Sequence, residues 1–360
     1  MNKAKIIVFD GHNDTLLNLY DNERGKGRSF FEQSETGHID LPRALAGGLG
    51  AGFFAVFIKS PPSQRTMTPD SYPGSTGQAG YELPKPPPVD PLYAIQTAMG
   101  MVSLLFQLEA ESDGKFAVAR SATDIQEAIN TGSVAAVLHF EGAEMIDREL
   151  AALDVFYQAG LRSLGPVWSR DNIFGTGVPF KFPTSPDIGP GLTADGKRLL
   201  KRCNELGILF DLSHLNEKGF WDVERLSDAP LVATHSNAHA LCPSARNLTD
   251  KQLDAIKGSN GVVGLNYHIA FLREDGRLVK DTSLSEIVKH ARYMADRIGV
   301  EHIALGSDFD GATMPADLKD AAGLPKLIDA LLADGFSEEE VTLIAHGNWL
   351  RVLEATWKAS

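Results

Sequence analysis

The sequence is poor in cysteine, and it lacks a long apolar run and a cluster of basic residues. Its two cysteines, Cys203 and Cys242, are too few for a disulfide framework and stand in no CxxC or Cys/His zinc spacing, so we expect free thiols. We find no apolar run long enough to cross a bilayer, which argues against a membrane-spanning protein. A formal net charge of -13 without a basic run argues against nucleic acid as a partner, because it repels a phosphate backbone.

The N-terminal residues also lack the pattern of a secretory leader. The stretch 1–14, MNKAKIIVFDGHND, has too short an apolar core for a signal peptide, and we therefore expect a cytoplasmic protein. With 43% hydrophobic and 22% charged residues, the composition is that of a soluble globular protein. A length of 360 residues suits either two average domains or one α/β barrel with insertions.

Eight short apolar stretches are typical of buried strands in a parallel sheet. They cover residues 5–9, 51–58, 133–140, 162–168, 207–213, 230–235, 261–267 and 302–307. Helical patterns lie between most of them, and the clearest covers 283–298, with a capping box from Ser283 to Glu286 and Gly299 just past its end. This alternation predicts a distorted (β/α)8 barrel of the TIM type, which we treat as one domain over residues 1–360.

Two segments rich in proline and glycine follow predicted strands. Residues 59–90 contain PPS, SYPGSTG and ELPKPPPVD, and residues 169–192 contain VPFKFPTSPDIGPG. Such compositions form neither a helix nor a central strand. A linker between domains is the alternative for 59–90, but the segment 1–58 before it could not bury its own faces. We expect both segments to be active-site loops at the C-terminal face of the barrel.

Residues of the kind that bind metal ions close five of the eight predicted strands. They are His12, Asp14, Glu141, His214, His235 and Asp308. The C-terminal ends of all barrel strands lie on one face, so these side chains can meet although they are far apart in sequence. Neutral imidazole and carboxylate are ligands of zinc and other divalent ions. Any one of them alone is more often structural, but six at strand ends predict a site.

The same residues indicate hydrolysis assisted by metal ions. Glu141 is followed by Gly142, which leaves room beside the carboxylate, and its two oxygens could bridge two cations. Two cations that share a carboxylate can polarise a carbonyl and activate water, while Asp308 could carry a proton to the leaving group. His139 also faces inward by strand parity; it could support the site or fill the barrel, and we favour filling.

Seven motifs resemble those of the membrane (renal) dipeptidase family, metallopeptidases of the amidohydrolase superfamily. They are DGHNDTL at 10–16, EGAE at 141–144, GLRSLGPVWSRDN at 160–172, DLSH at 211–214, ATHSNAHALCPSARNLTD at 233–250, GSDFDG at 306–311 and GNWLRV at 347–352. The resemblance implies that His12 and Asp14 bind one zinc ion, that His214 and His235 bind the other, and that Glu141 bridges the two. It further implies that Asp308 transfers protons, that Arg246 grips the substrate carboxylate, and that the protein is a homodimer.

One position departs from the family pattern. Where active members of the family carry a histidine that stabilises the tetrahedral intermediate, this sequence has Trp168. Loss of one such donor typically costs about 100-fold to 1,000-fold in turnover, unless Trp168 or Arg170 substitutes. We expect a binuclear zinc dipeptidase that hydrolyses small dipeptides with activated water, with cobalt or manganese as other possible metals. The alternatives are a related hydrolase of another small amide or lactone, and a catalytically quiet protein that binds metal or peptide.

Overall fold

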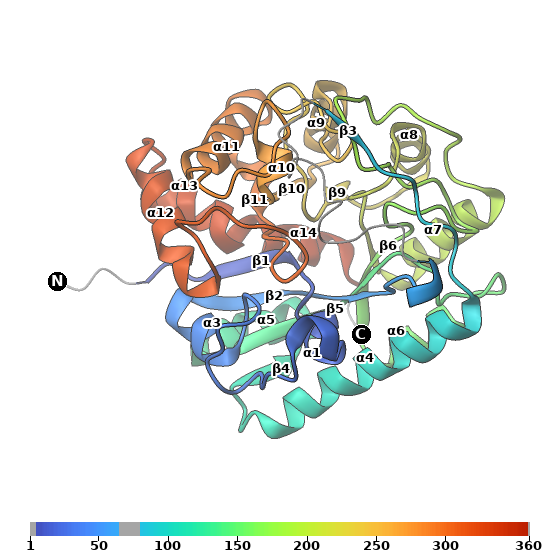
Figure 1. The fold of residues 1–360 in the computed structure, drawn as a ribbon, viewed down its shortest axis with the longest axis horizontal. Coiled ribbons are helices and arrows are strands. Elements are labelled where there is room, and N and C mark those ends of the chain that lie inside the picture. The colour runs from blue at the N-terminus through green and yellow to red at the C-terminus, as the bar shows by residue number, and fades with distance from the viewer. Residues whose placement is uncertain (1–4, 65–79, 359–360) are drawn as a thin grey trace.

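Strands and helices alternate along the chain in the computed structural model, which describes residues 5–64 and 80–358 (Figure 1). The strands are β1 (Val8–Asn13), β2 (Leu49–Phe57), β3 (Tyr81–Glu82), β4 (Phe116–Val118), β5 (Val134–Glu141), β6 (Leu161–Gly165), β7 (Lys181–Phe182), β8 (Leu209–Phe210), β9 (Val232–Ala233), β10 (Val262–Leu265) and β11 (Ile303–Leu305). The α-helices are α1 (Thr15–Tyr20), α2 (Asn22–Gly25), α3 (Leu41–Gly47), α4 (Pro91–Glu111), α5 (Ala122–Thr131), α6 (Ala151–Gln158), α7 (Ala194–Leu206), α8 (Glu217–Leu226), α9 (Asp250–Gly258), α10 (Ile269–Leu272), α11 (Ser285–Ile298), α12 (Leu324–Ala333), α13 (Glu338–Thr342) and α14 (Asn348–Thr356).

Eight parallel strands follow one another around a barrel in the order β1, β2, β5, β6, β8, β9, β10 and β11. Two hydrogen-bonded sheets cover β1 to β8 and β9 to β11. A bridge between Asp211 and Val232 joins β8 to β9, and a bridge between Asn13 and Phe309 joins β11 back to β1. The predicted barrel is therefore confirmed, and its distortion lies at these two seams, where single bridges replace a continuous ladder.

Aromatic side chains fill the interior of the barrel. The ring centroid of Phe53 lies 5.2 Å from that of Phe9 and 5.3 Å from that of Trp349, which enters from α14. The indole of Trp349 donates to the Leu305 carbonyl at 3.0 Å. Gly11 is required beside it, because a Cβ there would lie 2.6 Å from the Trp349 ring. The interior is thus a packed core, and chemistry is left to the ends of the strands.

The two predicted loops pair with each other. Tyr81 and Glu82 of β3 pair antiparallel with Phe182 and Lys181 of β7. The described part of the first loop begins at the C-terminal end of β2, and the second loop follows β6. Residues 65–79 of the first loop lie outside the described residues.

Several local features were not predicted or were predicted wrongly. The short helices α1, α3 and α5 and the strand β4, which pairs with β5, were not predicted. The capping box at Ser283 was wrong: α11 begins at Ser285 behind Leu284 without a side-chain cap, and the Ser283 hydroxyl accepts from the Ser285 backbone N–H instead. A π-helix, Leu343–Gly347, lies between α13 and α14.

Helix α4 contradicts the expectation that no apolar segment is long enough to cross a bilayer. An 18-residue window of this 21-residue helix reaches a mean hydropathy of 1.2, which by length and composition is enough for a membrane span. The helix lies against α1, β2 and β4 (Figure 1), and its buried residues include Ala98, Met101 and Leu105. A core helix of a soluble protein passes the same test, so this finding is weak evidence for a membrane span.

Candidate metal centre

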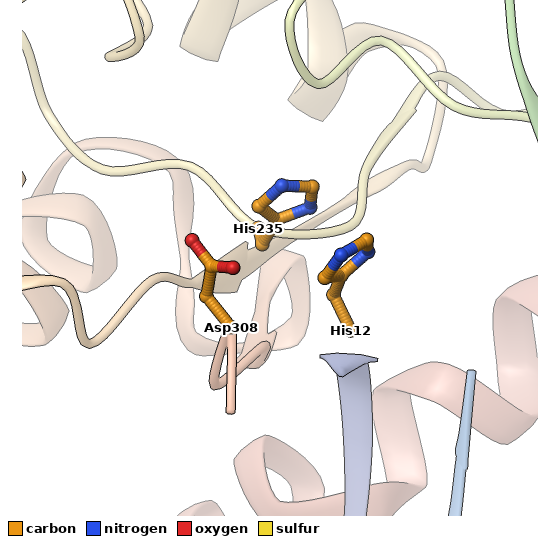
Figure 2. Close-up of side chains that lie close together, drawn as sticks. All are labelled: His12, His235 and Asp308. Carbon is orange, nitrogen blue, oxygen red and sulfur yellow. The ribbon is translucent and has the colours of Figure 1, made fainter. Parts of the chain in front are cut away.

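The structure brings the six predicted residues to one place at the C-terminal ends of the barrel strands. His12 and Glu141 belong to the ends of β1 and β5, and the other four follow β1, β8, β9 and β11 within a few residues. Figure 2 shows the side chains of His12, His235 and Asp308 turned toward a common region from three separate segments. Five of the six are buried, and Asp308 is partly exposed, which leaves the cluster open to a ligand on its side.

Glu141 lies at the centre of the cluster. Its Oε1 atom is 2.9 Å from Nε2 of His214, 3.5 Å from Nε2 of His235 and 3.6 Å from Nε2 of His12. Two groups of three potential ligands share this carboxylate: one adds His12 and Asp14, and the other adds His214 and His235. Within each group the ligand atoms lie within 4.8 Å of one another. This is the arrangement expected of two ions bridged by one carboxylate.

The buried polar atoms of the cluster fit a metal centre. Among the described residues, both ring nitrogens of His12 and Oδ1 of Asp14 have no hydrogen-bond partner. Buried polar atoms are normally hydrogen-bonded, and a bound cation is one of the few arrangements that satisfies carboxylates and imidazoles together. The donor set of three imidazoles and carboxylates is one that zinc accepts.

Burial sets the protonation preferences of the cluster. It raises the pKa of Glu141 well above its usual value, and it lowers the pKa values of His214 and His235 well below theirs, with Arg246 adding to the effect on both histidines. Burial also lowers the pKa of His12, but Glu141 and other carboxylates outweigh it and raise that pKa to about 10. Neutral His214 and His235 are in the form that binds metal ions.

Two of the six residues have strained backbones. His214 has a φ of 66° and Asp308 a φ of 62°, which place both in the left-handed region that most residues avoid. Gly311 leaves room for the two carboxylates, because a Cβ there would lie 2.0 Å from Oδ2 of Asp14 and 2.6 Å from Oδ1 of Asp308 and would displace them. Such strain is held by the surrounding structure and is common at functional sites.

Supporting hydrogen bonds involve residues that the sequence analysis did not single out. Ser169 Oγ lies 2.8 Å from Nδ1 of His214, and Asn266 donates to Oδ2 of Asp308 at 2.9 Å. Neither residue stands in a spacing that marks it as functional. His139 is fully buried, and its ring packs edge-on against that of His12, with the two centroids 5.5 Å apart.

An aromatic wall flanks the cluster and consists of Phe57, Trp168, Phe180 and Phe271. The Trp168 ring centroid lies 4.8 Å from that of Phe57, 5.4 Å from that of Phe180 and 5.9 Å from that of His214. Phe180 and Phe271 stack with centroids 6.3 Å apart. The wall therefore starts beside a candidate metal ligand and continues along one side of the site.

Arg246 lies at the other end of the aromatic wall. Its guanidinium is buried, its Cζ lies 5.5 Å from the Phe271 ring centroid, and Nη2 donates to the His235 carbonyl at 3.0 Å. The structure thus places a fixed positive charge next to the candidate ligands. A guanidinium in such a position is suited to binding a carboxylate.

The structure argues against Arg170 as a substitute for the histidine missing at position 168. Its side chain is fully buried and donates to Glu144 Oε1 at 2.8 and 3.1 Å, to the Ile58 carbonyl at 2.9 Å and to Ser60 Oγ at 3.2 Å. These bonds tie the second loop to the end of β2. Trp168 is partly exposed, and among the described residues its indole N–H makes no hydrogen bond.

Comparisons with known proteins agree on one family. The family model described as membrane dipeptidase (peptidase family M19) matches residues 3–360. A protein in the pqqA 5′ region of Klebsiella pneumoniae is 51% identical over 257 residues, which is 71% of this chain and 95% of that protein. The crystal structure of the dipeptidase AC, a metallopeptidase of family M19, has a TM-score of 0.91 at 47% identity, covering 99% of this chain and 100% of that chain. A metallopeptidase from Rhodobacter sphaeroides, liganded with a phosphinate mimic of the dipeptide L-Ala-D-Ala, has the same TM-score and identity and covers 98% and 100%.

Proposed function

This chain belongs to the membrane dipeptidase family, peptidase family M19, and is a metal-dependent dipeptidase, and we propose that it works with two zinc ions. The observation that carries the proposal is the central position of Glu141 Oε1, which lies within 3.6 Å of three imidazole Nε2 atoms. His12 and Asp14 would hold one ion with Glu141, and His214 and His235 would hold the other. Such ions, when bound, polarise a carbonyl oxygen and lower the pKa of water.

We assign the movement of the proton to Asp308. Its carboxylate is partly exposed and lies in a group of potential ligand atoms with His12 and His235 (Figure 2). Asn266 holds Oδ2 by a hydrogen bond at 2.9 Å. A carboxylate fixed in this way can take a proton from the attacking water and deliver it to the leaving amine.

We further propose that substrates are small dipeptides with at least one apolar side chain. Arg246 would bind the free carboxylate, because a guanidinium matches a carboxylate with two parallel hydrogen bonds. The aromatic wall between Arg246 and His214 would take up an apolar side chain. The Rhodobacter sphaeroides relative, which carries a mimic of L-Ala-D-Ala, supports the inclusion of substrates with a D-residue at the C-terminus.

The test is a hydrolysis screen of the zinc-reconstituted protein against L-L and L-D dipeptides, read by release of free amino acids. We expect cleavage, with apolar side chains preferred over charged ones. Phe180→Leu should weaken that preference, whereas Phe174→Leu is the control in the same loop, because Phe174 is fully buried and, among the described residues, its ring does not contact the wall. Absence of cleavage with two zinc ions bound per chain would contradict the proposal.

Trp168 favours a second candidate function, the hydrolysis of another small amide or a lactone. The indole N–H can donate one hydrogen bond but carries no charge, so the site offers less stabilisation to an oxyanion than a histidine would. A lactone has a better leaving group than an amide and needs less of this stabilisation. A panel of lactones and acyl amides, measured beside the dipeptides, separates the two candidates by their relative kcat/KM values.

A further inference from the structure

The protonation of His235 determines whether it can act as a metal ligand. Its Nε2 atom lies 3.5 Å from Glu141 Oε1 and 3.2 Å from Nε2 of His214, so it is the nitrogen that faces the cluster. A neutral imidazole carries its single proton on either Nδ1 or Nε2, and only the unprotonated nitrogen can bind a metal ion. His235 therefore serves as a ligand only when the proton is on Nδ1.

A chain of hydrogen bonds behind His235 fixes that proton. Thr234 Oγ1 donates its only proton to Asp211 Oδ2 at 2.7 Å. The same oxygen lies 2.8 Å from Nδ1 of His235. Because its proton is already donated to Asp211, Thr234 Oγ1 can only accept a hydrogen bond from this nitrogen. His235 must then donate from Nδ1, which leaves a lone pair on Nε2.

The Asp211 carboxylate acts only as a hydrogen-bond acceptor. Its Oδ1 receives the backbone N–H of Ser213 at 3.0 Å and that of Thr234 at 2.8 Å. Both bonds are buried, and Asp211 is 1% exposed, so water does not compete for the carboxylate. The backbone N–H of His235 in turn donates to Ser213 Oγ at 3.1 Å. One carboxylate thus connects the end of β8 to the end of β9 behind the cluster.

His214, which shares a group of potential ligands with His235, has a different hydrogen-bond partner. Nδ1 of His214 lies 2.8 Å from Ser169 Oγ. Within the described residues, no carboxylate receives the proton of the Ser169 hydroxyl, so either direction of this bond is allowed. Of these two histidines, only His235 is backed by a carboxylate that specifies the proton on its Nδ1.

We propose that Asp211 is a positioning residue that acts through Thr234 to hold His235 in its Nδ1–H tautomer, with Nε2 directed at the metal. The assignment rests on the metal centre proposed above. Partners of this kind fix the orientation of metal-binding histidines, and their loss typically lowers metal affinity by about 10-fold to 100-fold.

Asp211→Asn tests the proposal with almost no change of shape. The amide oxygen can still accept from the Ser213 and Thr234 backbones, but the amide N–H2 donates to Thr234 Oγ1. The threonine hydroxyl then turns its proton to Nδ1 of His235, and the imidazole proton moves to Nε2. Thr234→Val removes the relay, Thr234→Ser keeps it, and Ser169→Ala is the control at His214.

The direct measurement is the His235 tautomer in metal-free protein, by long-range 1H–15N spectra assigned with His235→Gln. We expect Nδ1–H in the wild type, in Thr234→Ser and in Ser169→Ala, and Nε2–H in Asp211→Asn. Zinc binding, measured by competition with a chromophoric chelator, should be roughly 10-fold to 100-fold weaker in Asp211→Asn and near wild type in Thr234→Ser.

An unchanged tautomer in Asp211→Asn would overturn the proposal, even if the variant loses stability or activity, because a purely structural role predicts that result. Wild-type zinc affinity in Asp211→Asn would overturn it as well. The tautomer is read without metal and without substrate, so a failure of the dipeptidase proposal would appear separately, as wild-type protein that binds no zinc or cleaves no dipeptide.

Discussion

Replacement of Arg170 by methionine should destabilise the fold strongly and affect catalysis only through the position of the aromatic wall. Arg170 makes four hydrogen bonds, two of them to Glu144, whose side chain is 2% exposed. Without Arg170, Glu144 keeps a buried charge, and its Oε2 already lacks a hydrogen-bond partner among the described residues. Removing one partner of a buried ion pair costs about 3 to 5 kcal/mol. A protein of ordinary stability has about 5 to 15 kcal/mol in all, so the loss should be large.

Denaturant unfolding followed by tryptophan fluorescence measures this loss, and a second variant isolates its cause. Glu144→Leu combined with Arg170→Met removes both charges, so it should recover part of the stability, because no carboxylate is left unpaired. A single Glu144→Leu should be about as destabilising as Arg170→Met. The three variants form a double-mutant cycle for the pair.

The opposite result would assign Arg170 to catalysis. If Arg170 replaced the missing histidine as the group that stabilises the oxyanion, Arg170→Met would lower kcat by about 100-fold to 1,000-fold. Its free energy of unfolding would then stay close to that of the wild type. This combination would refute the reasoning from burial and hydrogen bonding.

Three further results are expected. Asp308→Asn should lower kcat by about 100-fold or more while zinc content, measured by mass spectrometry, is unchanged; a loss of zinc would instead make Asp308 a ligand. Glu141→Gln should lower the occupancy of both ions together, and full retention of either would contradict its bridging position. His290 accepts from the Ala238 N–H and donates to the Leu272 carbonyl, and burial lowers its pKa to about 4. The unfolded chain therefore takes up the proton before the folded protein does. At about 1.4 kcal/mol per pKa unit, the free energy of unfolding contains about 3 kcal/mol that is fully present above pH 6.5 and is lost as the pH falls toward 4. Unfolding curves of His290→Gln across this range should lack that loss.

The eight barrel strands and the six clustered residues could be predicted from the sequence for one reason. Each strand is a short apolar run, and each candidate ligand stands at the end of such a run, as His235 follows Val232–Ala233. The ends of parallel strands share a face, so a local pattern is enough to predict a common location. The match at 10–16 and the other motifs then indicated the family, which the comparison over residues 3–360 confirmed.

Only the tertiary structure decided which polar residues form hydrogen bonds around the clustered side chains. Asp211 and Thr234 are separated by 23 residues, Asn266 and Asp308 by 42, and no local spacing predicts either contact. Arg170 could not be assigned from sequence, because its role depends on Glu144 and on the chain after β2, which reach it through loop packing. Local patterns specify which face of an element is buried, but the partner of a buried polar group depends on how distant segments pack, and this is fixed only when the barrel closes.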